Sequence, residues 1–533
     1  MIKPFATVLG AHTSLENKTG SWRTMRPEYV SRIPPCNVAC PAGENVQLWL
    51  SLAKEKKFFE AWKVMVKDNP FPAVMGRVCY HTCEKVCNRT QFDGAVNINL
   101  IERSVGDLAI FGRWSFEKVQ SESGKRVLIV GSGPSGLSAA YFLRMAGHDV
   151  IICEEHLKSG GMMRYGVPRY RLPTSVLDAE IKRIEALGVK IICGKKIRDL
   201  RDEVGNFDAV YIAVGAGIAT KHDAEVREGS DVTDAIDLFR KLEDEAIGPS
   251  YAGKKVVVCG GGNTAIDSAR TALRLGATNV KIVYRRTFNH MSAHETEIKE
   301  ALEEGVEILC LRNVSVVGKD SVLIDKMNYD EESGVLSKSN ETEVLEADGV
   351  IFAVGQKVED SAFWEIDGIK FSEDGTIEID KNMMTAAGGI FAGGDAVPGK
   401  RTVTHAIGHG KKAAKFIDAY LRGIKCAPAP KNEVVNFKKL NTDYYKKTAA
   451  AGNFSDPEIC FSQAEIVVES SRCFSCGNCF HCDNCLGYCP DNAIIKHPDG
   501  SLEINYDYCK GCGICAAECP CGSIKMVPED RSE

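Results

Sequence analysis

The chain has 533 residues, of which 44% are hydrophobic and 26% are charged, and its formal net charge is −6. This length suffices for about three or four domains, and the mild charge argues against nucleic acid as a partner. Most of the 22 cysteines stand in groups with metal-ligand spacing, and no basic start leads into an apolar leader, so we expect a cytoplasmic protein without a membrane span.

The first predicted unit begins with the apolar run 127–130, which leads into a glycine-rich turn and a helix. Glycines at such a turn let a pyrophosphate approach the backbone at the positive end of the helix. A second apolar strand, 150–153, ends in two glutamates, and a carboxylate at that place can accept hydrogen bonds from a ribose. The pattern predicts a dinucleotide site formed by Gly131, Gly133, Pro134, Ser135, Gly136, Glu154 and Glu155.

A second unit of the same design starts at residue 255, and its predicted contacts are Gly260, Gly262, Asn263, Thr264 and Ala265. Its next strand, 280–284, ends in Arg285 and Arg286 instead of an acid. Guanidinium groups bind a 2′-phosphate as a charge-assisted fork, whereas an acid would repel it. We therefore expect NADPH rather than NADH here, with a merely solvated strand end as the alternative.

Three further segments connect the two units. Residues 207–216 and 347–356 each read as a strand that ends in a glycine, Gly215 and Gly355, and residues 388–397 contain Gly394 and Asp395. This arrangement resembles the two-dinucleotide-binding flavoprotein superfamily. The resemblance implies that an FAD domain is interrupted by an NAD(P) domain, that FAD occupies the first unit, and that Asp395 binds the ribityl chain.

The segments 160–173 and 283–297, together with the N-terminal cysteines, narrow the resemblance. They are similar to the small subunit of glutamate synthase and its relatives, which include the NADPH-side domains of dihydropyrimidine dehydrogenase and the large subunit of NADH-dependent ferredoxin:NADP oxidoreductase. The resemblance covers roughly residues 30–425. The cofactor contacts that it implies also include Gly161, Met162, Arg171 and Thr404.

The N-terminal cysteines depart from this family, whose members hold two 4Fe-4S clusters there. The cysteines present are Cys36, Cys40, Cys79, Cys83 and Cys87. These thiolates are too few to ligate two cubanes fully. The resemblance implies one cluster near the flavin, held by Cys40, Cys79, Cys83 and Glu102, with Cys36 and Cys87 as remnants or substitutes. A small helical domain with inert buried thiols is the alternative.

The C-terminal region repeats the spacing C-x2-C-x2-C-x3-C-P, which holds two cubanes in bacterial ferredoxins. The fourth cysteine of each run reaches the other cluster, which predicts the ligand sets Cys479, Cys482, Cys485 with Cys519, and Cys509, Cys512, Cys515 with Cys489. A zinc ribbon pairs two C-x2-C knuckles and fits this spacing poorly, as does a disulfide-linked domain. Cys473 and Cys476 extend the register upstream, as alternative ligands or a separate site.

The sequence thus predicts a multidomain α/β protein with a helical iron-sulfur N-terminal domain, two Rossmann-like domains and a C-terminal α+β ferredoxin-like domain. The expected boundaries are 1–120 for the helical domain, 121–250 and 351–425 for the FAD domain, 251–350 for the NAD(P)H domain, 426–469 for a linker and 470–533 for the ferredoxin domain.

The expected function is electron transfer between NAD(P)H and a ferredoxin or a larger redox subunit, within a hetero-oligomer. FAD is expected to link hydride chemistry to single electrons, and no acid-base residue is required. If the N-terminal site is single, the chain holds about three 4Fe-4S clusters. A glutamate synthase small subunit and a wiring subunit without nucleotide chemistry are the alternatives.

Overall fold

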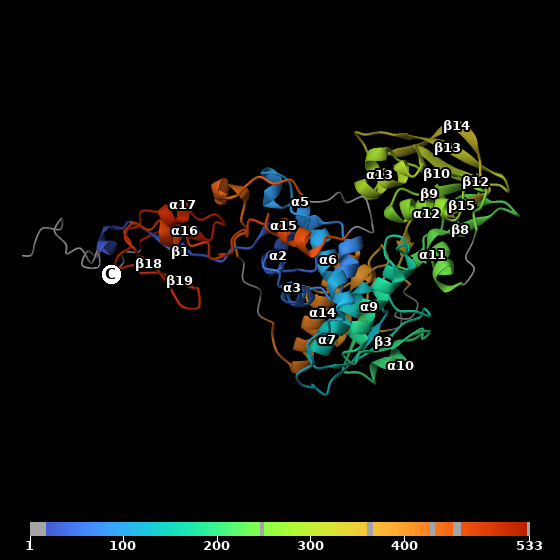
Figure 1. The fold of residues 1–533 in the computed structure, drawn as a ribbon. Helices are drawn as coiled ribbons and strands as arrows, with labels where there is room; N and C mark the ends of the chain where they lie inside the picture. The colour runs from blue at the N-terminus through green and yellow to red at the C-terminus, as the bar shows by residue number, and fades with distance from the viewer. Residues whose placement is uncertain (1–17, 246–249, 360–365, 427–431, 451–459, 530–533) are drawn as a thin grey trace, which may run out of the picture.

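The computed structural model describes residues 18–245, 250–359, 366–426, 432–450 and 460–529. A helical region built from the N-terminal part of the chain lies at the centre (Figure 1). The two dinucleotide-binding lobes lie on one side of it, and the ferredoxin-like lobe lies on the other. The helical region therefore stands between the two kinds of lobe.

The first dinucleotide-binding lobe is built on a five-stranded parallel sheet with strand order β17-β5-β2-β3-β4. The apolar runs seen in the sequence form its central strands, because a parallel sheet is covered on both faces. Helices α7 and α14 pack against each other on this sheet. The bounds are β2 Arg126–Val130, α7 Pro134–Met145, β3 Asp149–Cys153, α8 Met162–Tyr165, α9 Thr174–Glu185, β4 Lys190–Ile192, α10 Arg201–Val204, β5 Ala209–Ile212, β17 Ile390–Ala392, η6 Gly394–Ala396 and α14 Val403–Arg422.

The second lobe has a five-stranded parallel sheet, β11-β10-β9-β15-β8, and a four-stranded sheet, β14-β13-β12-β7. Its elements are β7 Glu225–Val226, β8 Val232–Asp234, α11 Ala235–Asp244, β9 Lys255–Cys259, α12 Asn263–Arg274, β10 Asn279–Tyr284, η5 Phe288–His290, α13 Glu295–Glu303, β11 Glu307–Cys310, β12 Arg312–Val317, β13 Ser321–Tyr329, β14 Leu336–Glu346 and β15 Gly349–Phe352. The chain crosses between the lobes at β6 Ile218–Ala219 and β16 Gln356–Lys357, which pair with each other. The predicted boundary at residue 250 therefore moves upstream, because β8 is too short to show an apolar pattern.

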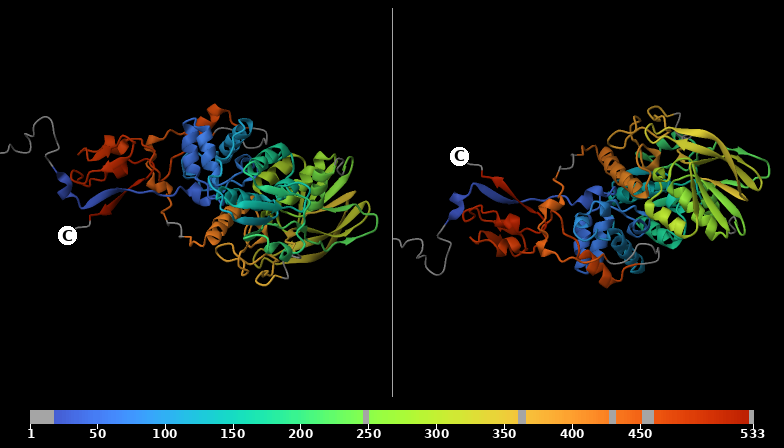
Figure 2. Two further views of the ribbon diagram at one scale, coloured as in Figure 1. Left: turned by 90° about the horizontal axis from the view of Figure 1, so that it is seen from below. Right: turned by 90° about the horizontal axis from the view of Figure 1, so that it is seen from above.

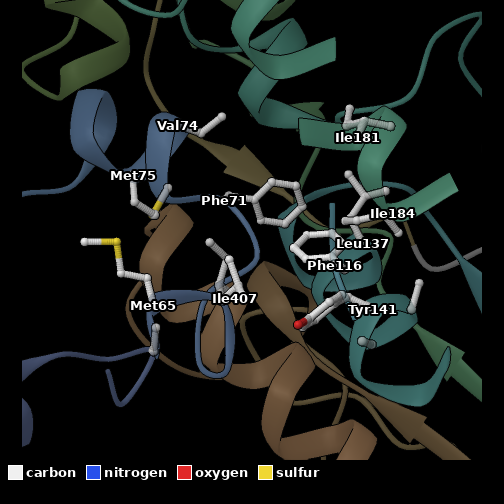
Figure 3. Packing of buried hydrophobic residues seen from close by; sticks show 14 of the residues in the cluster. Met65, Phe71, Val74, Met75, Phe116, Leu137, Tyr141, Ile181, Ile184 and Ile407 are labelled. Atoms are coloured by element: carbon white, nitrogen blue, oxygen red, sulfur yellow. The ribbon is translucent and has the colours of Figure 1, made fainter. Parts of the chain in front are cut away.

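The helical region shares one hydrophobic core with the first lobe. Phe71 and Met75, from the start and interior of the α4 segment, lie in the same cluster as Leu137 and Tyr141 of α7 and Ile407 of α14 (Figure 3). Because protein cores are close-packed, this shared core fixes the helices relative to the flavin-side sheet. The helices are α1 Pro35–Ala39, α2 Val46–Lys54, α3 Phe58–Val66, α4 Pro72–Val78, α5 Thr82–Lys85, η4 Asn88–Gln91 and α6 Ile98–Phe111.

The ferredoxin-like lobe includes a strand from the start of the described chain. Strand β1, Met25–Tyr29, pairs antiparallel with β20, Ile524–Pro528, and η3, Thr19–Trp22, precedes it. Two hydrogen bonds between Arg23 and Glu529, at 2.7 and 2.8 Å, add to this pairing. The predicted helical domain at 1–120 is thus corrected, because its first described residues belong to the other lobe. The remaining elements are α16 Asn484–Gly487, β18 Ile494–Lys496, β19 Leu502–Ile504 and α17 Ile514–Ala517.

The segment predicted as a linker, 426–469, is partly helical where it is described. It contains η7 Phe437–Lys439, η8 Thr442–Tyr444 and most of α15, Gln463–Ser470, which packs on α2 and α6. Ser462 and Glu465 form a capping box at the start of α15. This part of the predicted linker therefore docks on the helical region, and α15 ends at Ser470, one residue beyond the expected boundary. Both further views show the ferredoxin-like lobe projecting from that region, away from the two nucleotide lobes (Figure 2).

No helix among the described residues is long and apolar enough to cross a bilayer.

Candidate cofactor cavity and iron-sulfur sites

A single cavity of about 850 Å³ lies where the two dinucleotide-binding lobes meet. This volume falls within the range of roughly 300 to 1,000 Å³ that is usual for cofactor sites. Most of the cofactor contacts predicted from the sequence line it: Gly131, Gly133, Pro134, Ser135, Glu154, Glu155, Gly161, Met162, Arg171, Gly215, Gly260, Gly262, Asn263, Thr264, Arg285, Arg286, Gly355, Gly394 and Asp395. Gly136, Ala265 and Thr404 are not part of the wall.

The glycine turn of the first unit leaves no space for side chains. Gly131 has φ +103°, and a Cβ there would stand 2.5 Å from the carbonyl oxygen of Ala213. A Cβ on Gly161 would stand 2.5 Å from the Cα of Gly133, at the N-terminus of α7. A helix N-terminus with bare backbone beside it suits a pyrophosphate, which fits the predicted placement of FAD. Gly136 lies behind the wall, where a Cβ would meet the Gly131 carbonyl oxygen at 2.0 Å.

Two carboxylates predicted to bind the flavin nucleotide face this cavity. Glu154 follows β3, and its Oε2 accepts hydrogen bonds from the backbone N–H and the hydroxyl of Ser132, at 2.8 and 2.6 Å. This holds the acid against the glycine turn. Burial raises the pKa of Asp395 to about 6, and the Arg401 guanidinium opposes that rise. Both roles stay predictions.

The second unit repeats the glycine geometry. Gly260 has φ +142°, and a Cβ there would stand 2.4 Å from the carbonyl oxygen of Ala353. Asn263, the first residue of α12, accepts a hydrogen bond from the His294 N–H at 2.7 Å and donates one to the Tyr80 hydroxyl at 2.6 Å. This amide therefore ties the nucleotide-binding helix to the helical region. The arginines at positions 285 and 286 are exposed at the rim of the cavity, accessible to a phosphate.

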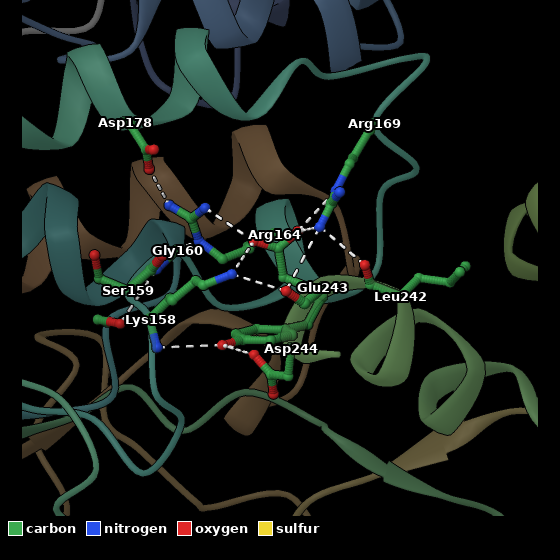
Figure 4. A network of polar contacts seen from close by, with 11 residues as sticks. Lys158, Ser159, Gly160, Arg164, Arg169, Asp178, Leu242, Glu243 and Asp244 are labelled. Carbon is green, nitrogen blue, oxygen red and sulfur yellow. Dashed lines mark hydrogen bonds and ion pairs between the residues drawn. The ribbon is translucent and has the colours of Figure 1, made fainter. Parts of the chain in front are cut away.

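Charged side chains join the two lobes beside the cavity. Arg171 lines the cavity, yet its guanidinium bonds Asp267 of α12 at 2.7 Å and Glu297 of α13 at 2.5 Å. Its predicted contact with cofactor competes with these pairs. A second group of ion pairs centres on the buried carboxylate of Glu243 in α11. This carboxylate pairs with Arg169 at 2.7 Å and with Lys158 at 3.0 Å (Figure 4). These contacts fix the relative position of the two nucleotide units.

The cavity reaches the N-terminal cysteines. Val78 and Tyr80, the two neighbours of Cys79, line its wall. The Thr404 hydroxyl, in the first turn of α14, donates a hydrogen bond to the Cys79 sulfur at 3.4 Å. Thr404 thus contacts the predicted cluster ligand and not the cavity. The predicted cluster ligand Cys79 therefore stands directly behind the wall, on the side of the first dinucleotide-binding unit.

The predicted proximal ligands Cys40, Cys79, Cys83 and Glu102 lie close together. Burial raises the pKa of the Cys83 thiol, and the charges of Glu84, Cys79, Cys40 and Glu102 raise it further. Charges act in this way only over a few ångströms. Glu102 is buried and accepts a hydrogen bond from the Asn69 amide at 2.9 Å. Burial and the neighbouring carboxylate of Glu44 raise its pKa well above the ordinary value.

The predicted remnants Cys36 and Cys87 lie in a different place, next to Cys473 and Cys476. Burial raises the pKa of the Cys36 thiol, and the charges of Cys473, Cys87 and Cys476 raise it further. The Asn88 amide, directly after Cys87, donates a hydrogen bond to the Cys476 sulfur at 3.4 Å. Sequence spacing named Cys473 and Cys476 as alternative ligands or a separate site but did not connect them with Cys36 and Cys87. The signal was the C-x2-C register that continues upstream of the ferredoxin run.

The ferredoxin thiols form two groups with the predicted membership. The charges of Cys479, Cys482 and Cys519 act on the pKa of Cys485, which burial raises. Burial also raises the pKa of Cys509, and the charges of Cys489 and Cys512 raise it further. A small cavity is lined by the second predicted set, Cys489, Cys509, Cys512 and Cys515. Thiols that converge from two runs fit a cubane, whose four ligands bind four different irons.

No group of three or more His, Cys, Asp or Glu among the described residues is arranged to hold a single metal ion. The ligand roles themselves stay predictions.

Comparison with protein-family models matches residues 125–410 to the pyridine nucleotide-disulphide oxidoreductase model. The chain belongs to that family. Residues 26–113 match domain II of dihydropyrimidine dehydrogenase with its 4Fe-4S cluster, and residues 502–525 match a 4Fe-4S binding domain. The predicted fold class, the FAD and NAD(P)H cofactors, and 4Fe-4S clusters in both terminal regions are thereby confirmed.

Curated relatives of this oxidoreductase are subunits of larger redox enzymes. The chain is 34% identical over 75% of its length to the beta subunit of an NADP(+)-dependent formate dehydrogenase from Moorella thermoacetica, of which it covers 62%. It is 31% identical to the beta subunit of the NADPH-Fe(3+) oxidoreductase of Geobacter sulfurreducens, covering 83% of this chain and 75% of the relative. It is 33% identical to the glutamate synthase [NADPH] small chain of Azospirillum brasilense, covering 74% of this chain and 88% of the relative. The chain spans about half to three fifths of the length of some relatives that it matches.

Proposed function

We propose that this oxidoreductase transfers electrons between NADPH and a partner redox protein that docks on its ferredoxin-like lobe. When bound, NADPH exchanges a hydride, iron-sulfur clusters exchange single electrons, and FAD can do both. The residues of this chain bind and orient these groups and keep water away from them. Hydride transfer to a flavin requires no acid-base side chain.

The observation that carries the proposal is the position of Cys79. One cavity is lined by both glycine turns, so that a flavin and a nicotinamide bound to them share one enclosed space. The wall of that space contains Val78 and Tyr80, which flank Cys79. The Thr404 hydroxyl holds the Cys79 sulfur from the flavin-side helix α14. A hydride site therefore adjoins a cluster site, which is the arrangement that electron transfer requires.

The choice of NADPH rests on the arginines at the rim. Arg285 and Arg286 follow β10, are exposed and line the cavity. No salt bridge of either side chain occurs within the described part of the chain, and Arg171 nearby is already paired with two carboxylates. Two available guanidinium groups at this place suit a 2′-phosphate.

The partner surface is proposed at the far lobe. Cys482 and Cys512, one from each predicted ferredoxin ligand set, are exposed there. Electron transfer between proteins needs a cluster near the surface, and this lobe projects away from the nucleotide lobes (Figure 2). The relatives named above are subunits of formate dehydrogenase, Fe(3+) oxidoreductase and glutamate synthase, which supports a ferredoxin or a larger redox subunit as partner, in a cytoplasmic hetero-oligomer.

The test is rapid mixing of the anaerobic, full-length protein with NADPH, with flavin absorbance and cluster electron paramagnetic resonance as readouts. The Cys79→Ser variant should let NADPH bleach the flavin but should delay reduction of the ferredoxin-lobe clusters. Cys310→Ser is the control, because Cys310 is a free thiol of β11 that does not line the cavity. Equal cluster reduction in Cys79→Ser and the control would contradict the proposed path.

A further inference from the structure

Four cysteines from three distant parts of the chain meet between the helical region and the ferredoxin-like lobe. Cys36 lies in α1, Cys87 precedes η4, and Cys473 and Cys476 follow α15. Cys36 and Cys476 are buried, and Cys87 and Cys473 pack against the same core as Cys36. We propose that Cys36, Cys87, Cys473 and Cys476 hold a further 4Fe-4S cluster, so that the chain carries two N-terminal-region clusters and not one.

The four sulfurs are mutually close. Hydrogen bonds link the segments that carry them. The Gln47 backbone N–H donates to the side chain of Asn37, next to Cys36, at 3.3 Å, and the Gln47 side-chain amide donates to Ser475, between Cys473 and Cys476, at 2.6 Å. The Asn88 amide, next to Cys87, donates to the Cys476 sulfur at 3.4 Å, and, in addition to burial, the charges of these thiols raise the pKa of one another. The proximal set behaves separately, since the charges that act on Cys83 come from Cys79, Cys40 and two glutamates. The two groups are therefore distinct sites.

Short helices divide the N-terminal cysteines between the two sites. Cys36 lies in α1, and Cys40 directly follows that helix. Cys83 likewise lies in α5, and Cys87 follows that helix at the start of η4. One cysteine of each pair faces the proximal group, and the other faces the second group. Each site then has two N-terminal cysteines at least, and the second site is completed from the C-terminal segment.

The sulfurs of this second group receive N–H donors, as cluster thiolates do. The Asn88 amide donates to Cys476 at 3.4 Å, and the Ser475 backbone N–H donates to Cys473 at 3.4 Å. The Gln47 amide holds the Ser475 hydroxyl at 2.6 Å, which ties the loop between the two cysteines to α2. Such donors stabilise thiolates, and an inert buried thiol does not need them.

The C-terminal segment is fixed at this place. The side chain of Arg472, directly before Cys473, is 2% exposed and bonds Glu469 at 2.5 Å and the carbonyl oxygens of Gly94 and Ala95 at 2.8 Å each. The Arg32 N–H donates to the Gly477 carbonyl oxygen at 3.2 Å on the other side of the loop. The loop that supplies Cys473 and Cys476 is thus anchored at both of its ends.

A cluster at this position would also relay electrons between the proximal site and the ferredoxin-like lobe. This role as a relay rests on the proposed function. Only Gly477 and Asn478 separate Cys476 from Cys479, so these two Cα atoms lie at most about 11 Å apart. The Tyr445 hydroxyl donates a hydrogen bond at 2.9 Å to the carbonyl oxygen of Phe474, which stands between Cys473 and Cys476. A cluster here connects the proximal site to the ferredoxin-like lobe.

The test is an iron and acid-labile sulfide count on full-length protein purified without oxygen, combined with ⁵⁷Fe Mössbauer spectroscopy. We expect about sixteen irons per chain, from about four cubanes. The Cys473→Ser/Cys476→Ser variant should hold about twelve. The matched control is Cys310→Ser, in strand β11, which should keep all of them.

Iron loss in combined cysteine variants identifies which cysteines share one cluster, because substitutions of ligands to the same cluster do not add. Adding Cys36→Ser to the double variant should remove no further iron, because the same cluster is already lost. Adding Cys40→Ser should remove about four more. Flavin content checks that each variant is folded, and the wild-type count decides independently of any variant.

Some outcomes would overturn the site. About twelve irons in the wild-type protein, one zinc per chain, or a Cys473–Cys476 disulfide under anaerobic conditions would each exclude the cubane. Failure of the proposed function would look different, since the iron count would stand while NADPH failed to bleach the flavin.

Discussion

Arg472 is expected to hold the C-terminal segment on the helical region. The Arg472 side chain is 2% exposed, and the side chain of its partner Glu469 is 0% exposed. Arg472 also donates a hydrogen bond to the Thr448 carbonyl oxygen at 3.1 Å. Replacing it by methionine keeps an unbranched apolar chain but removes the cation that pairs with the buried Glu469 carboxylate, which keeps its hydrogen bond from the Asn97 N–H at 2.9 Å. Removing one member of a buried ion pair costs about 3 to 5 kcal/mol.

This cost should appear as local opening of α15. At about 1.4 kcal/mol per tenfold change, amide exchange protection should fall roughly a hundredfold to several thousandfold. The assay is native-state hydrogen exchange, read at the Ile466 amide, which bonds the Ser462 carbonyl oxygen at 2.9 Å. The amide of Leu128, a fully buried residue of β2 in the first dinucleotide-binding lobe, serves as an internal reference.

Arg422→Met is the matched control. The Arg422 side chain is 46% exposed and pairs with Asp418, so its loss should cost no more than about 1 kcal/mol. If Ile466 exchanges equally fast in the Arg472 and Arg422 variants, the buried pair does not anchor the segment, and the reasoning fails.

Three further predictions concern the cofactor sites. Replacing Arg285 and Arg286 by serine should raise the KM for NADPH by roughly ten- to a hundredfold per lost contact and leave that for NADH almost unchanged in steady-state assays. Cys512→Ser should damage one ferredoxin-lobe cluster, seen by electron paramagnetic resonance, while NADPH still bleaches the flavin. Gly131→Ala should lose FAD, measured as flavin per chain, because a Cβ would stand 2.5 Å from a carbonyl oxygen at φ +103°, whereas Gly205→Ala, with nothing within 4 Å, should keep it.

Each of these three predictions would be contradicted by a specific result. An equal rise in the KM for both nucleotides would make the arginines general surface charge. Loss of flavin bleaching in folded Cys512→Ser protein would contradict the order of carriers. A full complement of FAD in the Gly131→Ala protein would show that the glycine turn is not required.

The local signals were sufficient for the two nucleotide units and the ferredoxin ligand groups. A glycine turn is specified by its own backbone, as at Gly131 and Gly260, whose φ values are +103° and +142°. The C-x2-C-x2-C spacing brings three thiols together whatever surrounds them. These features depend on neighbours in the sequence, so the sequence predicts them directly.

Tertiary structure alone decided which distant segments meet. The pairing of β1 with β20 joins the two ends of the described chain, and no pattern in a five-residue strand names its partner. Cys36 and Cys87 looked like remnants because their neighbours Cys473 and Cys476 lie almost the whole chain away. The resemblance predicts Arg171 as a cofactor contact, and only the tertiary structure shows that its guanidinium also pairs with two carboxylates of the second lobe. Such contacts depend on packing between lobes, which local spacing does not encode.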